Sequence, residues 1–393
     1  MATFNLRYFS HPALLRAIAP SRLLAFLSPY RIFLTARGFQ WPDDGAEISY
    51  DKLVEIFTTP DADTPEDLVD ALFLVDEMSA PEQSDALVDA ELERGIVFAD
   101  DEQSMVDIAV QMWLSAPELL ERKHAEKFAF KPKSFEYFQA ARGRDLDYQP
   151  LNNETRLLLQ NELDDWFEKK QRGRGSRVMI WENEYDVRFL IRHGEPFKRD
   201  EKLAGEEVSG ISYRPLKYDV VIYDRKLSEL QINATLVGQK KTYCQLLGKY
   251  LFGDERCFPA IAKYTLDPLR DEGPESIVCS DVDGIDSVTL TEVHVLWGGA
   301  FRELEIHKAT DVFSALSSRG LRLPENARII KAVLKVKFAN CKTPRTVKIR
   351  PSNIAEFTRD GDSVMLKQWL ELRGFCIPRE VREHATSSVL AGA

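Results

Sequence analysis

Residues 177–191 read RVMIWENEYDVRFLI, and this stretch decides the fold class. Two short runs rich in apolar side chains, 177–181 and 187–191, flank the polar segment ENEYD. Two such runs around a polar turn predict a β-hairpin. Before residue 177 the apolar residues repeat with the 3.6-residue period of a helix, so the chain changes from helical to strand patterning here.

The hairpin pattern recurs toward the C-terminus. Further hairpins are predicted from the paired segments 218–223 with 230–236, 276–279 with 287–296, and 329–338 with 346–349. Helices are predicted at 239–251 and 361–373, and each ends at a glycine, as helices commonly do. Hairpins in succession with helices between them favour a mostly antiparallel α+β domain over a doubly wound parallel one.

The residues before the hairpins predict helices. Thr64-Pro65-Glu66-Asp67 is a helix-start signal, and Ser79–Glu82 and Ser115–Glu118 repeat it; we expect the helix after Ser79 to stop at Gly95. A length of 393 residues favours two domains. We therefore expect an all-helical acidic interaction domain over 1–150, a hairpin-built α+β domain over 151–380, and a disordered tail over 381–393.

The composition excludes a membrane-spanning helix, because no apolar run approaches ~18 residues. The N-terminal residues carry arginines and are interrupted by prolines, so we expect no signal peptide. The five cysteines are scattered without metal-ligand spacing, which is typical of reduced thiols. These features predict a cytoplasmic protein with no membrane partner.

Charge is distributed unevenly. Residues 1–37 contain five arginines and no acid, whereas residues 38–121 contain 23 acids and two bases, a net charge of −21. The remaining residues carry +5, which completes the net charge of −11. The acidic block repels phosphate, so it is excluded as a nucleic-acid footprint and is interpreted as a docking surface for a protein partner or as a solvated face.

The motif Leu190-Ile191-Arg192-His193-Gly194-Glu195 resembles the strand-end RHGE signature of the histidine phosphatases. That resemblance implies a histidine that attacks phosphorus and an arginine that holds the phosphoryl oxygens. Here the motif lies in mid-chain on the second strand of a hairpin, and no later histidine has the matching context. We interpret it as the polar end of a strand.

A second motif combines Asp219, on one predicted strand, with Glu229 and Gln231 on the next. Gln239 and Tyr243 follow one helical turn apart. The set resembles the restriction-endonuclease-like nucleases, and the resemblance implies that Asp219, Glu229 and Gln231 are catalytic, with Asp219 and Glu229 holding Mg²⁺ beside an activated water. A plain hairpin is the alternative interpretation.

The basic segment 326–355 contains eight bases and no acid. Side chains alternate along a strand, so the predicted hairpin gathers five cations on one face and apolar residues on the other. The five are Lys331, Lys335, Lys337, Lys348 and Arg350. Like charges across a ladder destabilise it, and an anion would relieve this repulsion. A lysine-rich edge that resists aggregation is the alternative.

Three hypotheses follow. The first is a non-catalytic accessory protein without a cofactor that contacts nucleic acid or another polyanion through this hairpin. The second is the Mg²⁺-dependent nuclease. The third is a scaffold whose acidic and basic parts recognise each other.

Overall fold

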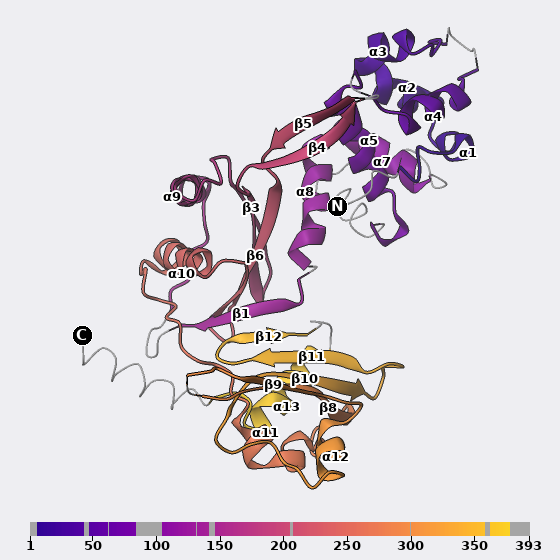
Figure 1. Cartoon of the computed structure of the whole chain (residues 1–393). Helices are drawn as coiled ribbons and strands as arrows, with labels where there is room; N and C mark the ends of the chain where they lie inside the picture. Colours follow the sequence, from indigo (N-terminus) through magenta and orange to yellow (C-terminus); the bar gives the residue numbers. More distant parts are fainter. Residues whose placement is uncertain are drawn as a thin grey trace. The chain divides into compact units, whose positions relative to one another are not determined.

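The structure is a computed structural model of the chain, and it describes residues 6–42, 47–61, 63–83, 104–130, 132–140, 146–204, 207–298, 300–357 and 362–377. The protein is α+β, as the sequence predicted: a helical region comes first and a large antiparallel sheet follows (Figure 1). Its contacts define two units, Met1–Phe130 with Arg199–Ser212, and Lys131–Lys198 with Tyr213–Ala393. The expected tail lies outside the described residues.

The first unit is mainly helical. Its helices are α1 (Pro12–Leu15), α2 (Pro20–Leu27), α3 (Arg31–Ala36), α4 (Tyr50–Thr58), α5 (Glu66–Met78), α7 (Met105–Ser115) and α8 (Pro117–Phe130), with 3₁₀ turns η1 (Ser28–Tyr30) and η2 (Pro81–Gln83). The signals at Thr64 and Ser115 begin α5 and α8 as predicted. The helix expected to stop at Gly95 lies largely outside the described residues.

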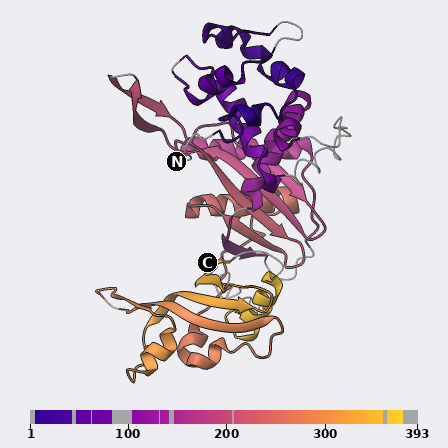
Figure 2. The same ribbon diagram turned by 90° about the vertical axis from the view of Figure 1, so that its right-hand side faces the viewer.

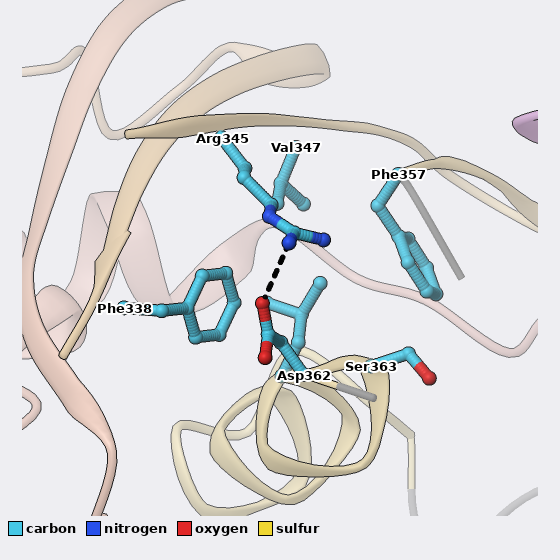
Figure 3. A pocket seen from close by; sticks show the side chains of 7 residues that line it. Phe338, Arg345, Val347, Phe357, Asp362 and Ser363 are labelled. Carbon is cyan, nitrogen blue, oxygen red and sulfur yellow. Dashed lines mark ion pairs between the residues drawn. The ribbon is translucent and has the colours of Figure 1, made fainter. Parts of the chain in front are cut away.

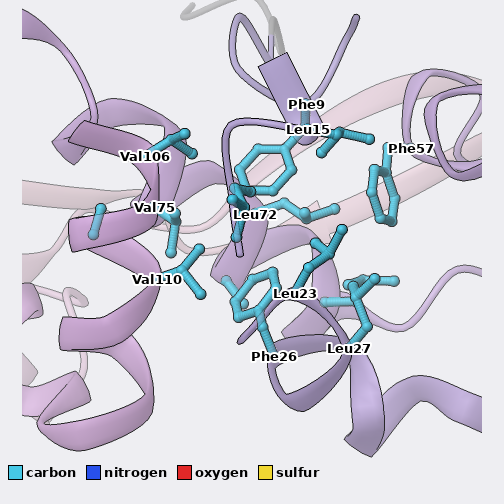
Figure 4. Packing of buried hydrophobic residues seen from close by; sticks show 14 of the residues in the cluster. Phe9, Leu15, Leu23, Phe26, Leu27, Phe57, Leu72, Val75, Val106 and Val110 are labelled. Atoms are coloured by element: carbon cyan, nitrogen blue, oxygen red, sulfur yellow. The ribbon is translucent and has the colours of Figure 1, made fainter. Parts of the chain in front are cut away.

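An aromatic cluster lies at the centre of the helical unit (Figure 4). Phe9 is fully buried, with its ring centroid 6.1 Å from that of Phe26 and 6.0 Å from that of Phe57. The buried Asp107 of α7 accepts a hydrogen bond of 2.9 Å from the Ala19 amide, which precedes α2. This bond satisfies one of the free N–H groups at the start of α2 and fixes α2 against α7.

The second unit contains a 10-stranded sheet with the order β2-β3-β6-β7-β1-β12-β11-β10-β8-β9. Its strands are β1 (Ser134–Gln139), β2 (Arg177–Glu182), β3 (Asp186–Gly194), β6 (Leu216–Asp224), β7 (Glu229–Asn233), β8 (Ile285–Leu296), β9 (Leu304–Lys308), β10 (Arg328–Phe338), β11 (Arg345–Arg350) and β12 (Ile354–Glu356). All of the described pairings in this sheet are antiparallel. A separate two-stranded ribbon consists of β4 (Lys198–Ala204) and β5 (Glu207–Tyr213), and most of it belongs to the first unit.

The helices of this unit are α9 (Asn153–Lys169), α10 (Val237–Phe252), α11 (Asp267–Asp271), α12 (Val312–Ser317) and α13 (Ser363–Leu372), with the 3₁₀ turn η3 (Gly273–Ile277). The hairpins β2–β3, β6–β7 and β10–β11 confirm three of the four predicted hairpins. Helices α10 and α13 confirm the predicted helices. Gly253 and Gly374 follow them with φ angles of 69° and 70°, a conformation that glycine adopts readily.

Two predictions about individual segments were wrong. Residues 276–279 do not form a strand with β8; Ser276 and Ile277 end η3, and β8 pairs instead with β10 and β9. Strand β1 lies in the part of the chain that was predicted to be all helical. Its partners, β7 and β12, are distant in sequence, and no adjacent run could indicate the pairing.

The pairing register shows that the helices cover opposite faces of the two halves of the sheet. Directly opposed residues share a face, and the register links Val221 to Ile232, Ile232 to Glu136, Glu136 to Ile354, and Ile354 to Arg350. Val221 and Ile232 belong to the core that α9 and α10 cover. The same face therefore continues to the exposed Arg350 on β11.

On strands β8–β12 the other face is covered. Val347 of β11 and Phe357, which follows β12, line the same small pocket as Leu366 of α13. Figure 1 shows α11, α12 and α13 on one side of these strands, and Figure 2 shows the orange and yellow strands side by side from another direction. Within the described ranges no helix lies on the side of β8–β12 that carries Arg350, and we call this side the open face.

The helical unit contains a histidine whose burial makes the fold sensitive to acid. His124 of α8 is largely buried, with its ring centroid 5.6 Å from that of Phe128, and burial is the main reason that its pKa falls to about 4. Because the unfolded chain takes up this proton near the ordinary pKa of ~6.5, stability is complete above pH 6.5 and declines as the pH falls toward 4.

We predict that His124→Gln removes this dependence. In the parent chain it amounts to a difference of about 3 kcal/mol in the free energy of unfolding between pH 7 and pH 4. Hydrogen exchange of α8 peptides across that range measures it. His11→Asn, at an exposed position in the same unit, is the control and should retain the full decline. An equal decline in His124→Gln would contradict the prediction.

Candidate functional site

The structure does not bring Asp219 together with Glu229 and Gln231. In the β6–β7 pair Glu229 lies opposite Asp224, five residues from Asp219. Five steps along a strand separate two residues by about 17 Å and place them on opposite faces. One divalent ion cannot contact both carboxylates, and the predicted catalytic set is corrected on this point.

Asp219 lies instead in a buried polar cluster under α10. Its Oδ2 atom is 3.0 Å from Nε2 of His193 and accepts a hydrogen bond of 2.8 Å from the Tyr243 hydroxyl. The Gln239 amide nitrogen also donates to Oδ2 and lies 3.0 Å from the Tyr243 hydroxyl. Gln239 and Tyr243 are one turn apart on α10, so the spacing seen in the sequence aims both side chains at one carboxylate.

Further side chains close the cluster. The ring of Phe167, from α9, stacks on His193 with centroids 4.4 Å apart, and Nδ1 of His193 is 2.8 Å from the Gly194 carbonyl oxygen. Arg172 approaches the same nitrogen at 3.5 Å. His193 is 1% exposed, so it cannot reach a phosphate in solvent. Its position supports the strand-end interpretation of the RHGE motif.

The cluster carries an electrostatic cost. The pKa of Tyr243 lies well above its ordinary value. Burial is the largest cause, and the charge of Asp219 is the next. Oδ1 of Asp219 and Oε1 of Gln239 are buried, and no hydrogen-bond partner for either lies within the described residues. The sequence motif identified Asp219, Gln239 and Tyr243, but Arg172 and His193 join them only through the fold.

Glu229 makes a different interaction on the opposite face. Its two carboxylate oxygens accept hydrogen bonds of 2.8 and 2.7 Å from Nζ of Lys263, which also lies 4.2 Å from the centroid of the Tyr137 ring. Tyr137 is directly opposite Gln231 in the β1–β7 pair. Glu229 and Gln231 are both buried, and a buried charge requires such a partner.

The surroundings of Asp219 do not form the expected Mg²⁺ site. The β7 residues that share its face are Leu230 and Ile232, and both are apolar and buried. Among the described residues no group of three His, Cys, Asp or Glu side chains is arranged to hold a metal ion. The residues present therefore do not fit the ligand set that the nuclease resemblance implies.

The basic hairpin has the predicted register. Val333 opposes Lys348 and Lys335 opposes Thr346, so Lys331, Lys335 and Lys337 share a face with the even-numbered residues of β11; a bulge between Ile329 and Lys331 reverses the alternation at the start of β10. All five predicted cations therefore lie on the open face. The apolar partners Leu334 and Val347 lie on the covered face and are buried.

Three of the five cations already have carboxylate partners, which the sequence analysis did not anticipate. Neighbouring strands or strand ends supply the acids. The N–O distances are 2.6 Å for Lys331 with Glu292, 2.6 Å for Lys348 with Glu356, and 3.7 Å for Lys337 with Asp286. The acids are absent from segment 326–355 and reach it only across the ladder.

Lys335 and Arg350 are the exposed members of the set. The Lys335 ammonium donates a hydrogen bond of 2.6 Å to the Thr346 hydroxyl, a neutral partner. Within the described part of the chain neither side chain forms an ion pair with a carboxylate. These two positions retain free positive charge.

Glu292 of β8 is a carboxylate on the open face that several cations approach. A hydrogen bond from Lys331, then one from His294, lowers the pKa of Glu292 to about 2. Lys308 of the edge strand β9 also approaches it, at 3.4 Å. One carboxylate thus offsets several cations, so the open face keeps an excess of positive charge.

Arg345, another base of the segment, belongs to the covered face. It opposes Val336, and its guanidinium forms an ion pair of 3.0 Å with Asp362 beside Phe338 (Figure 3). The pair lies in a small pocket against α13, so Arg345 is not available on the open face.

Comparisons with known proteins leave the site to be interpreted from its geometry. No protein-family model matches the chain, and a comparison with curated proteins finds no match. Among the described residues, no helix has the length and apolar character needed to cross a membrane.

The Asp219 cluster should stabilise the fold, because three polar groups share its buried carboxylate. We predict that Asp219→Asn lowers the free energy of unfolding by about 3 kcal/mol, since it breaks a buried charged network. Tyr243→Phe, which removes one hydrogen bond and no charge, should cost about 1 kcal/mol. Denaturant unfolding measures both, and an unchanged midpoint for Asp219→Asn would show that the network contributes nothing to stability.

Proposed function

We propose that the protein binds nucleic acid, without catalysis, through the open face of strands β8–β12. The observation that carries the proposal is the register of β10 with β8 and β11, and of β11 with β12, which puts five cations on the side of these strands that none of the described helices covers. A positive surface attracts phosphate irrespective of base sequence.

The charge balance of the open face supports the proposal. Its cations are Lys308, Lys331, Lys335, Lys337, Lys348 and Arg350, and the carboxylates paired with them are Glu292, Glu356 and Asp286. Six charges opposed by three leave a net excess of positive charge. The pairs of Lys331 and Lys348 are half-buried, so an incoming phosphate must compete with their carboxylates, whereas Lys335 and Arg350 are exposed to it directly.

The same balance sets limits on the binding. Cations that are half neutralised release few counterions, so we expect affinity for duplex DNA to be moderate and to fall with salt along a shallow slope. The alternative scaffold requires that acids of residues 38–121 pair with the cations of the β10–β11 hairpin, which we call the basic ribbon. In the described structure the acids paired with its cations come from the same unit, which favours an external polyanion over that alternative.

We predict that the double substitution Lys335→Glu with Arg350→Glu weakens DNA binding at least tenfold at low salt, because it reverses the two free charges. Fluorescence anisotropy with a labelled 20-base-pair duplex measures the loss. Lys226→Glu with Lys241→Glu is the matched control, since it makes the same charge change at exposed sites outside the basic ribbon. Parent-like binding by the Lys335/Arg350 variant would exclude the open face as the binding site.

Removing the internal acids should have the opposite effect. We predict that Glu292→Gln with Glu356→Gln strengthens duplex binding several-fold and steepens its salt dependence, because Lys331 and Lys348 become available to phosphate. A salt titration of the dissociation constant measures both quantities. Glu182→Gln with Glu184→Gln, on the β2–β3 hairpin, removes two other acids and should change neither the affinity nor the slope appreciably. Equal gains in both variants would indicate a nonspecific effect of net charge.

A further inference from the structure

A hollow of about 550 Å³ lies at the end of strands β8 and β10. It is lined by Leu296, Trp297, Gly298, Arg302, Asn326 and Arg328. Trp297, Gly298 and Arg302 follow β8 in the connection to β9, while Asn326 precedes β10 and Arg328 begins it. Two arginines and an indole thus border one open space.

One side of the hollow borders the open face. Arg328 opposes Leu296, and Lys331 opposes His294. Leu296 and His294 are two residues apart on β8 and therefore share a face, so Arg328 extends the row of cations toward the end of the sheet. The Trp297 indole bonds to Glu305, which opposes Val295 on the covered face, so a strand leaving the open face would turn around the end of the sheet to reach the indole.

The arginines of the hollow are available to an anion. Arg302 and Arg328 are both exposed, and no carboxylate in the described ranges forms an ion pair with either. This differs from the ribbon itself, where three of the five lysine and arginine side chains are paired. Guanidinium groups also bind phosphate through two parallel hydrogen bonds, which a lysine cannot do.

Trp297 is held in a defined position. Its amide donates a hydrogen bond of 2.9 Å to the Glu303 carbonyl oxygen, and its indole N–H donates one of 3.0 Å to the Glu305 carboxylate. These bonds fix one edge of the ring while the side chain remains partly exposed. A fixed indole offers a stacking surface without the entropy cost of ordering it on binding.

We propose that this hollow binds one unpaired nucleotide of the nucleic acid, with Arg302 and Arg328 on its phosphate and Trp297 stacked on its base. The proposal rests on the function proposed above and refines it, because it makes the preferred ligand a duplex with a single-stranded end. The volume accommodates a nucleotide, and stacking on the indole requires a base that is free of its partner strand.

The experiment compares two labelled DNA molecules that share one 20-base-pair duplex, one blunt and one with a four-thymidine overhang. We expect the parent chain to bind the overhang DNA at least tenfold more tightly than the blunt DNA. Trp297→Ala and Arg302→Gln should each abolish most of this preference and leave blunt binding unchanged. Trp297→Phe keeps an aromatic surface and should retain the preference for the overhang DNA. Trp181→Ala, at a tryptophan outside the hollow, is the matched control and should also retain this preference.

The outcomes separate this inference from the binding function. Lys335→Glu with Arg350→Glu should weaken both DNA molecules and preserve their ratio. Blunt binding without a preference for the overhang would overturn the nucleotide site alone. A preference that survives both Trp297→Ala and Arg302→Gln would also overturn it. Failure of the parent chain to bind either DNA would overturn both proposals.

Discussion

The pairing of strand β1 with β7 on one side and β12 on the other is the constraint on which the second unit depends. It joins two hairpin-built halves into one 10-stranded sheet. Each half has its own helices, and the register through β1 shows that they cover opposite faces. The face that α9 and α10 bury on one half of the sheet is therefore the same face that is open on β8–β12, where its cations contact solvent.

Charge on the open face illustrates a balance between folding and binding. Five cations on adjacent strands repel one another, and the cost is reduced where Glu292, Glu356 and Asp286 approach from neighbouring segments. Neutralisation is incomplete, since Lys335 and Arg350 have no such partner among the described residues. The face is consequently stable enough to fold and still carries net positive charge.

The Asp219 cluster has the composition of a catalytic site and the surroundings of a structural one. A carboxylate, an imidazole, an amide and a phenol converge within hydrogen-bond distance. They are buried, however, and the neighbouring β7 side chains Leu230 and Ile232 supply no second ligand. Its polar groups bind one another and thereby hold α10 against the sheet, which accounts for their burial without a reaction.

The sequence by itself determined the elements whose signals are local. Alternation, tight turns and terminal glycines identified three hairpins and two helices of the second unit, and alternation also predicted that Lys331, Lys335, Lys337, Lys348 and Arg350 share a face. Only the tertiary structure decided which segments meet. It decided that β1 joins the halves, that Asp219 and Glu229 point to opposite sides, and that acids from other strands reach the basic ribbon. It also brought Trp297 and Arg328 to the border of one hollow. The physical reason is that a local pattern fixes side-chain direction within a strand, whereas long-range pairing fixes each strand's neighbours and the face that the helices cover.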